Sequence, residues 1–370
     1  MSQTDQLDRY LPAQVRTWFE ETYYARINDQ AQLEAALADP TFYCDPAAHL
    51  ALFNDHGVVH VRDVAQQMLR LLDHVNGSLI ARRDQERLGG FMKSYGVLVA
   101  FLHDIGMIDF SRFGRAMHPE FASQAAFDPA FDHVVDAIWQ SNCGGVASRL
   151  CALSGAGALA QDPRLVLREM LAMANCHSKS KVPVAILNER HLLREHMRQA
   201  IAEDLQVLYQ RYRVARAQAA LASEASDTAR AELADALRQA EAGLAGADPT
   251  GKLADARRAN LSRLYADFDR DAFGWLLAEN PDVRALAADV VDTLRVLRCA
   301  DALRQRGSVL KTSGGYEIFV DQTSADAVFA LRRGPQLLLS ALSVPIAAGE
   351  ANVASSSLDD GNLRISFHRG

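Results

Sequence analysis

The sequence predicts a mainly α-helical protein that ends in a small α+β section. Before Gly307, apolar residues recur every three or four positions in several long segments, which is the spacing of one helix face. From Gly307 onward, glycine, aromatic and β-branched residues dominate runs such as GGYEIFVD and NLRISFH, which are typical of short strands. We therefore expect three parts: N-terminal helices over 1–44, a helical domain over 45–310 and a β-containing section over 311–370.

Two helical units are predicted in the N-terminal part of the chain. The first should end at Pro40, because proline cannot continue a helix, and it has an apolar residue at every fourth position: Leu11, Val15, Phe19 and Tyr23. The second is closed by Asn76 and Gly77, and its apolar stripe consists of Val61, Val64, Ala65, Met68, Leu72 and Val75. His60 stands at the start of this second helix, beside the stripe.

The stretch FLHDIGMID follows a third apolar stripe, formed by Phe91, Tyr95, Leu98, Val99 and Leu102. Gly106 occupies the position of a helix C-cap, so we expect the helix to end there. His103 and Asp104 are adjacent, and adjacent side chains project about 100° apart on a helix. Both can reach one ion only at a helix end or in a cleft beside it, which suggests a divalent metal site as a hypothesis.

The residues after Asp109 look like a loop, SRFGRAMHPEFASQAAF. Within it His118 precedes Pro119, and proline is favoured in the first turn of a helix. A further helix is predicted over 163–177, with Leu167, Met170, Ala174 and His177 on one face. It must stop before Pro183.

Residues 189–266 are rich in alanine, arginine and glutamate, a composition that favours long exposed helices. Their apolar spacing is too irregular for a coiled coil, so we expect a helical hairpin that is broken near 246–251. Such an insertion projects from the protein, covers a site or mediates homodimerisation.

The last predicted helix, over 281–304, has a buried stripe of Val283, Leu286, Val290, Leu294 and Leu297. Asp301 occupies the next position on that stripe. A carboxylate there is costly unless it is paired or bound to a metal.

Composition restricts the possible partners and the compartment. The 370 residues include 39 basic and 46 acidic side chains, a net charge of −7, which gives no overall attraction to nucleic acid or anionic membranes. The five cysteines form no CxxC pair and are interpreted as reduced thiols of a cytoplasmic protein. We also expect no signal peptide and no membrane span.

Four polar residues stand on core-facing stripes: His60, His103, Asp104 and Asp301. A single buried histidine is more often a core residue with a hydrogen-bond partner than a ligand. Four such positions together favour a metal site, and nitrogen with carboxylate oxygen suits Zn²⁺, Fe²⁺, Mn²⁺ or Mg²⁺.

His60, the His103-Asp104 doublet in FLHDIG and Asp301 in RCADALRQRG resemble the HD-domain superfamily of metal-dependent phosphohydrolases, over about residues 45 to 310. The resemblance implies an HD-type helical bundle in which these four residues bind a first metal ion. It also implies that His118 and His177 bind a second ion or contact phosphate, with Asp104 bridging two ions. Met107 replaces the lysine of the HD-GYP group, so cyclic di-GMP is not supported as the substrate.

The expected function is hydrolysis of a phosphoester in a nucleotide or related metabolite, by water that one or two divalent ions activate. Asp104 and His56 are the catalytic candidates, although His56 is equally suited to cap a helix. The expected substrate contacts are Lys179, Lys181, His118 and His177, and several arginines, Arg115 and Arg298 among them, lie near motif residues. The alternatives are a non-catalytic sensor or scaffold that binds a nucleotide and signals through its insertion or C-terminal section, and a purely structural helical protein.

Overall fold

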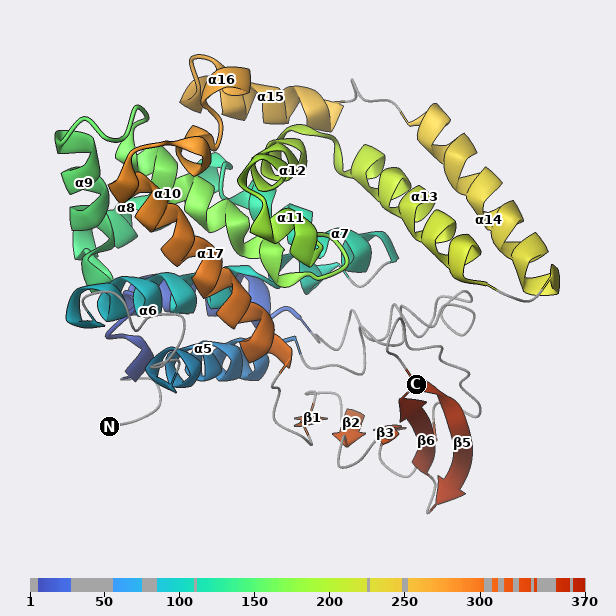
Figure 1. Cartoon of the computed structure of the whole chain (residues 1–370). Helices are drawn as coiled ribbons and strands as arrows, with labels where there is room; N and C mark the ends of the chain where they lie inside the picture. Colours follow the sequence, from blue (N-terminus) through green and yellow to red (C-terminus); the bar gives the residue numbers. More distant parts are fainter. Residues whose placement is uncertain are drawn as a thin grey trace.

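The computed structural model describes residues 6–27, 56–74, 85–109, 112–224, 227–247 and 252–302, and strand segments between 308 and 369. The prediction of a mainly helical protein is confirmed (Figure 1). The first half comprises α2 (Ala13–Phe19), the π-helix η1 (Glu20–Tyr24), α5 (Val58–His74), α6 (Gln85–Leu102), η3 (Ile105–Ile108), α7 (Arg112–Ala125), η4 (Pro129–Phe131), α8 (Asp132–Ser141), η5 (Cys143–Gly145) and α9 (Val146–Gly155). The second half comprises α10 (Pro163–Ala172), η6 (Met173–His177), α11 (Val184–Asn188), α12 (Arg190–Ala202), α13 (Leu205–Ser223), α14 (Asp227–Gly246), α15 (Lys252–Leu264), α16 (Phe268–Asp271), η7 (Gly274–Leu277) and α17 (Pro281–Ala302).

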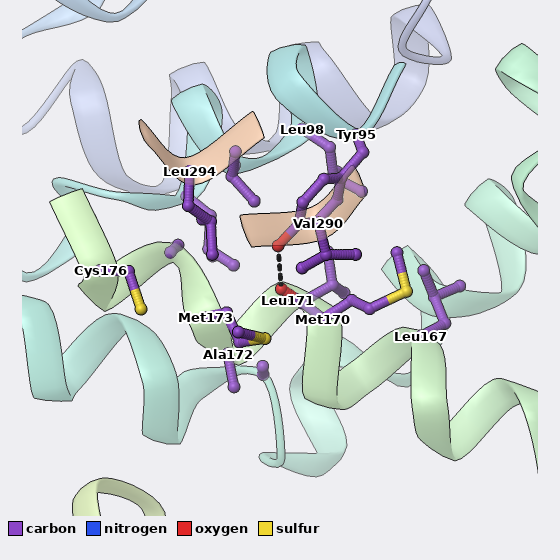
Figure 2. Close-up of a cluster of buried hydrophobic side chains, with 14 of the residues drawn as sticks. Tyr95, Leu98, Leu167, Met170, Leu171, Ala172, Met173, Cys176, Val290 and Leu294 are labelled. Carbon is purple, nitrogen blue, oxygen red and sulfur yellow. Dashed lines mark hydrogen bonds between the residues drawn. The ribbon is translucent and has the colours of Figure 1, made fainter. Parts of the chain in front are cut away.

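The core lies where α5, α6, α10, α17 and η6 meet. Figure 2 shows Tyr95 and Leu98 of α6 facing Met170 of α10 and Val290 of α17, all of them at most 2% exposed. The Tyr95 hydroxyl donates a hydrogen bond of 2.8 Å to the carbonyl oxygen of Met170. Because apolar burial is the main stabilising contribution to folding, this junction fixes how the helix ends are placed.

The stretch Gly90–Ile108 is long and apolar enough to cross a membrane by length and composition, but 89% of its apolar window is buried inside the structure. A core helix of a globular protein meets the same test. Its burial follows from its position, because α5, α17 and η6 all pack on α6.

Two predicted helix boundaries are corrected by the structure. α6 ends at Leu102 and not at Gly106, so His103 and Asp104 lie in the turn that follows it. The segment expected to be a loop after Asp109 is instead mostly the helix α7, which continues through Pro119.

The predicted helical hairpin exists, but its turn is placed differently. α13 and α14 pack side by side and extend away from the rest of the helices in Figure 1, and α13 ends at Ser223 while α14 begins at Asp227. The break expected near 246–251 corresponds to the end of α14 at Gly246, after which α15 begins at Lys252.

The N-terminal unit is described only in part. Leu11, Val15 and Phe19 are buried as their spacing predicts, and the hydroxyl of Tyr24 donates to the carbonyl oxygen of Phe101, 3.0 Å away. The expected helix end at Pro40 and the boundary at position 44 lie outside the described residues.

The described part of the C-terminal backbone forms the strands β1 (Ser308–Lys311), β2 (Tyr316–Asp321), β3 (Asp326–Arg333), β4 (Gln336–Leu337), β5 (Ala351–Asp359) and β6 (Asn362–Arg369). Their order is β1-β2-β3-β6-β5, with β4 paired to β3, and all pairs are antiparallel. Pairs such as Ile318 with Leu331 and Val328 with Ser366 fix the register, and the β5–β6 pair is irregular between Val353 and Ser355.

Glu169 connects α10 to the segment that leads back from the insertion. Its carboxylate accepts hydrogen bonds from the Tyr265 hydroxyl at 2.6 Å and from the backbone N–H of Phe273 at 2.7 Å. The residue is fully buried, and burial raises the pKa of its carboxyl to about 7. The charged form of Glu169 is therefore the less favourable one in the folded protein.

This shift predicts how stability depends on pH. Because the folded pKa is raised above the ordinary value of 4.5, the stabilisation is complete below that value and is lost as pH rises through about 7. Relative to Glu169→Gln, the free energy of unfolding of the wild type should fall by up to about 3 kcal/mol across this window. Urea denaturation at pH 5, 6, 7 and 8 measures it. Glu195→Gln, at an exposed glutamate, is the control, and parallel curves for the wild type and Glu169→Gln would contradict the prediction.

Candidate metal centre

The ends of several helices meet at one cluster of histidine and aspartate side chains. His60 lies in the first turn of α5, His103 and Asp104 follow α6, and Asp301 lies near the end of α17. His118 comes from α7, and His177 is the last residue of η6. Two groups each place one ligand atom per residue within 4.8 Å of one another: His60, His103 and Asp301 form the first triad, and Asp104, His118 and His177 form the second.

Asp104 belongs to the second triad and also faces the histidines of the first. Its Oδ2 is 3.2 Å from Nε2 of both His60 and His103, and its Oδ1 is 3.4 Å from Nε2 of His118 and 3.6 Å from Nε2 of His177. The first triad is completed by Asp301, whose Oδ1 is 3.7 Å from Nε2 of His60. Each carboxylate oxygen of Asp104 therefore faces a different triad.

Three imidazoles are oriented in the same way. Nδ1 of His103 donates to the carbonyl oxygen of Ala100 at 2.7 Å, Nδ1 of His118 donates to that of Arg115 at 2.6 Å, and Nδ1 of His177 donates to that of Ala174 at 2.9 Å. A carbonyl only accepts, so Nδ1 carries the hydrogen in each ring. Nε2 of the neutral ring then presents a lone pair to the cluster, which is the arrangement of a metal-binding histidine.

Pro119 explains both the helix and the orientation of His118. It lacks the N–H that would bond to the carbonyl oxygen of Arg115, four residues earlier in α7. The Nδ1–H of His118 takes that carbonyl instead. The helix thus tolerates an internal proline, and its missing hydrogen bond turns His118 toward Asp104.

The nitrogen atoms of the cluster lack the hydrogen bonds that buried imidazoles normally make. Nε2 of His60 and Nε2 of His103 are buried without a hydrogen-bond partner among the residues that the structure describes. Nε2 of His118 and Nε2 of His177 are 3.0 Å apart, so when both rings are neutral their lone pairs repel unless a proton or a metal cation lies between them. The buried histidines and aspartates therefore form a site that can hold a metal ion, and nitrogen with carboxylate oxygen fits a divalent cation.

The electrostatics of the cluster centre on Asp104. Burial alone would raise the pKa of its carboxyl, but the adjacent His103, with His60 and His56, holds that pKa well below its ordinary value. Burial lowers the pKa of His103, but Asp104 and Asp301 outweigh it and raise the pKa to about 8. Burial, followed by the proximity of His103, lowers the pKa of His177 to about 3. Asp104 therefore remains ionised and His177 keeps its neutral, ligand-competent form, whereas His103 is protonated at neutral pH and offers its Nε2 lone pair once that proton is lost.

The prediction that Gly106 caps α6 is wrong. Gly106 instead allows η3 and α7 to approach each other closely. A Cβ atom at this position would lie 2.6 Å from Cα of His118 and 2.7 Å from its carbonyl oxygen. Only glycine permits η3 and α7 to pack this closely. The approach brings His118 to the side of Asp104 opposite His60.

A cavity of about 390 Å³ opens beside the cluster. The described residues that line it come mainly from five segments and are mostly polar: His56, Asp104, Met107, Arg115, His118, His177, Ser178, Lys179, Ser180, Arg298 and Asp301. His56 precedes α5, and its Nε2 is 4.0 Å from Oδ2 of Asp104.

The two lysines expected to contact substrate are placed differently. Lys179 is exposed and lines the cavity. Lys181 is absent from its described lining, and its Nζ lies 3.2 Å from Oε1 of Glu120 and 3.9 Å from the centroid of the Tyr212 ring. The prediction for Lys181 therefore has no support in this geometry, because a buried ion pair already uses its charge.

Two of the arginines that lie near motif residues in the sequence, Arg115 and Arg298, line the cavity, whereas Ser178 and Ser180 were not predicted as site residues. The two serines are the sequence neighbours of Lys179 in HSKSK, so they could have been predicted to lie at the site together with that lysine. The arginines are close to motif residues in the sequence, but closeness in sequence does not determine the direction in which a side chain points.

Comparisons with models of protein families, with curated proteins and with solved structures found no match.

The close approach at Gly106 gives a direct test of the packing. Gly106→Ala should lower the free energy of unfolding by about 1–3 kcal/mol, because the new methyl group overlaps the backbone of His118. Gly155→Ala is the matched control, since a Cβ at Gly155 meets nothing within 4 Å, and it should change stability by less than about 0.5 kcal/mol. Urea denaturation measures both, and equal stability of the two variants would argue against the described contact.

Proposed function

We propose that this protein is a metal-dependent phosphohydrolase of the HD type, acting on a phosphoester of a nucleotide or related metabolite. The observation that carries the proposal is the position of Asp104, whose two oxygens face two separate groups of imidazole nitrogens. The sequence resemblance of His60, His103-Asp104 and Asp301 to the HD-domain superfamily supports the same assignment.

In this proposal, His60, His103 and Asp301 would hold a first ion, His118 and His177 would hold a second, and Asp104 would supply a carboxylate oxygen to each. A bound divalent cation lowers the pKa of a water molecule and offsets charge on a phosphoryl oxygen. The Nδ1–H bonds of His103, His118 and His177 keep each Nε2 directed at the site, so little reorganisation is needed on binding.

The chain also supplies groups for the substrate. His56 lines the cavity, and in the proposed reaction its imidazole donates a proton to the leaving-group oxygen. Lys179 and the serines on either side of it line the same cavity and contact the phosphoryl oxygens. His118 and His177 would act as metal ligands rather than as substrate contacts, because they face Asp104.

A second candidate is a non-catalytic nucleotide-binding sensor, and one observation favours it. The ring of Tyr212, on the projecting helix α13, contacts Lys181. Lys181 lies only two residues after Lys179 in the chain. Occupancy of the cavity would then be transmitted to the α13–α14 hairpin. Binding of metal and nucleotide without turnover of any phosphoester in a broad panel would favour this candidate over the hydrolase.

Asp104→Asn tests the metal site and the reaction together. Removing the shared carboxylate charge should lower the metal content of protein purified without chelators by at least about tenfold and abolish hydrolysis. Metal is measured by elemental analysis, and hydrolysis by phosphate release from a phosphoester panel with Mn²⁺, Mg²⁺ or Fe²⁺.

Asp136→Asn is the matched control, because this exposed aspartate pairs with Arg164 on the surface. It should retain both metal and turnover. If Asp104→Asn hydrolyses phosphoesters as well as the wild type does, the proposed mechanism is wrong.

A further inference from the structure

Arg298 occupies an unusual position on the wall of the cavity. It lies one turn before Asp301 on α17 and is only 6% exposed. Its Nε donates to the carbonyl oxygen of Cys176, and its Nη2 donates to that of Val182, both at 2.5 Å. The guanidinium therefore joins the two ends of the segment that carries His177 and Lys179.

These two hydrogen bonds leave Nη1 of the guanidinium without an acceptor among the residues that the structure describes. A buried donor left in this state is costly. No ion pair links Arg298 to a described carboxylate, and no acidic side chain is among the groups that act on its pKa, so its charge is not neutralised by an acidic neighbour. Since the residue lines the cavity, an anion bound there can supply both the missing acceptor and the missing charge.

The rest of the cavity wall points to the same chemistry. Lys179 lines it without an ion pair to another described residue, and the hydroxyls of Ser178 and Ser180, 3.2 Å apart, flank that lysine. Met107 is the single apolar side chain among the described lining residues. This wall suits the anionic end of a ligand, because guanidinium, ammonium and hydroxyl groups all donate to phosphate oxygens.

We propose that Arg298, with Lys179 and the two serines, forms a binding site for a terminal phosphoryl group, so that the cavity takes phosphomonoesters in preference to phosphodiesters. This inference rests on the proposed function of the same cavity. A phosphomonoester carries nearly two negative charges near neutral pH, whereas a diester carries one. Two divalent ions would more than offset the charges of Asp104 and Asp301, and the added positive charges of Arg298 and Lys179 then favour the more highly charged group.

Binding of simple phosphates tests the site without relying on catalysis. Calorimetric titration of the full-length, Mn²⁺-loaded protein with methyl phosphate and with dimethyl phosphate should show at least about tenfold tighter binding of the monoester. Arg298→Gln should weaken methyl phosphate binding by about 10- to 100-fold, the usual effect of losing a charged hydrogen bond. Equal affinities for the two phosphates, or an unchanged affinity in Arg298→Gln, would overturn the proposal.

Arg295→Gln is the matched control, because Arg295 lies one turn earlier on α17, pairs with Asp292 and does not line the cavity. It should bind methyl phosphate like the wild type. Metal content is measured for every variant, so that a lost ion is not mistaken for a lost anion contact.

Arg298 also holds a segment in place, and a second variant separates the two roles. Lys179→Gln removes a charge that supports no backbone contact among the described residues, and it should weaken methyl phosphate binding about 3- to 10-fold without changing the melting temperature. No weakening in Lys179→Gln would count against the site even if Arg298→Gln failed to fold.

The result can also be told apart from the fate of the hydrolase proposal. Selective, Arg298-dependent binding of methyl phosphate without hydrolysis of any ester supports the phosphoryl site and refutes the reaction. If the wild type hydrolyses a phosphoester, but Arg298→Gln and Lys179→Gln bind methyl phosphate with unchanged affinity, the reaction is supported and the phosphoryl site is refuted.

Discussion

Burial of the Asp104 carboxylate is the constraint around which the helices are arranged. The residue is 3% exposed, and an ion removed from water to this extent is strongly destabilising unless other groups compensate it. Imidazoles from α5, η6, α7 and the turn after α6 surround it, all through Nε2 atoms within 3.6 Å. No single helix can provide this coordination. The elements must therefore bring their ends or kinks to one point, which the apolar junction of α6, α10 and α17 makes possible.

The orientation of the imidazoles comes from backbone groups that the helices leave unused. Ala100 lies in the last turn of α6, where carbonyls have no helical partner, and Pro119 leaves the carbonyl of Arg115 in the same state. A histidine three residues after such a carbonyl donates its Nδ1–H to it. The features that end or interrupt these helices thus also set the tautomer and direction of the side chains that meet at Asp104.

The segment from Cys176 to Val182 connects the candidate centre to the rest of the molecule. Arg298 holds its two ends, and Lys181 anchors it to Glu120 on α7 and to Tyr212 on the projecting hairpin. Lys179 lies between these anchors and lines the cavity. Buried polar contacts on both sides therefore fix the position of an otherwise exposed, cationic stretch, which is what a preorganised binding site requires.

The helical class, the apolar stripes of α5, α6 and α17, and the unusual polar positions His60, His103, Asp104 and Asp301 could all be predicted from the amino-acid sequence. These follow from local periodicity, because an ionisable residue on a core-facing stripe is visible without knowledge of its neighbours. Three features could not be predicted without the folded chain: Lys179 lines the cavity while Lys181 is buried in an ion pair, Gly106 allows the close approach of α7, and Arg298 lines the cavity. Those features depend on contacts between segments far apart in the chain, and residue spacing carries no information about which distant backbone or side chain a group will meet.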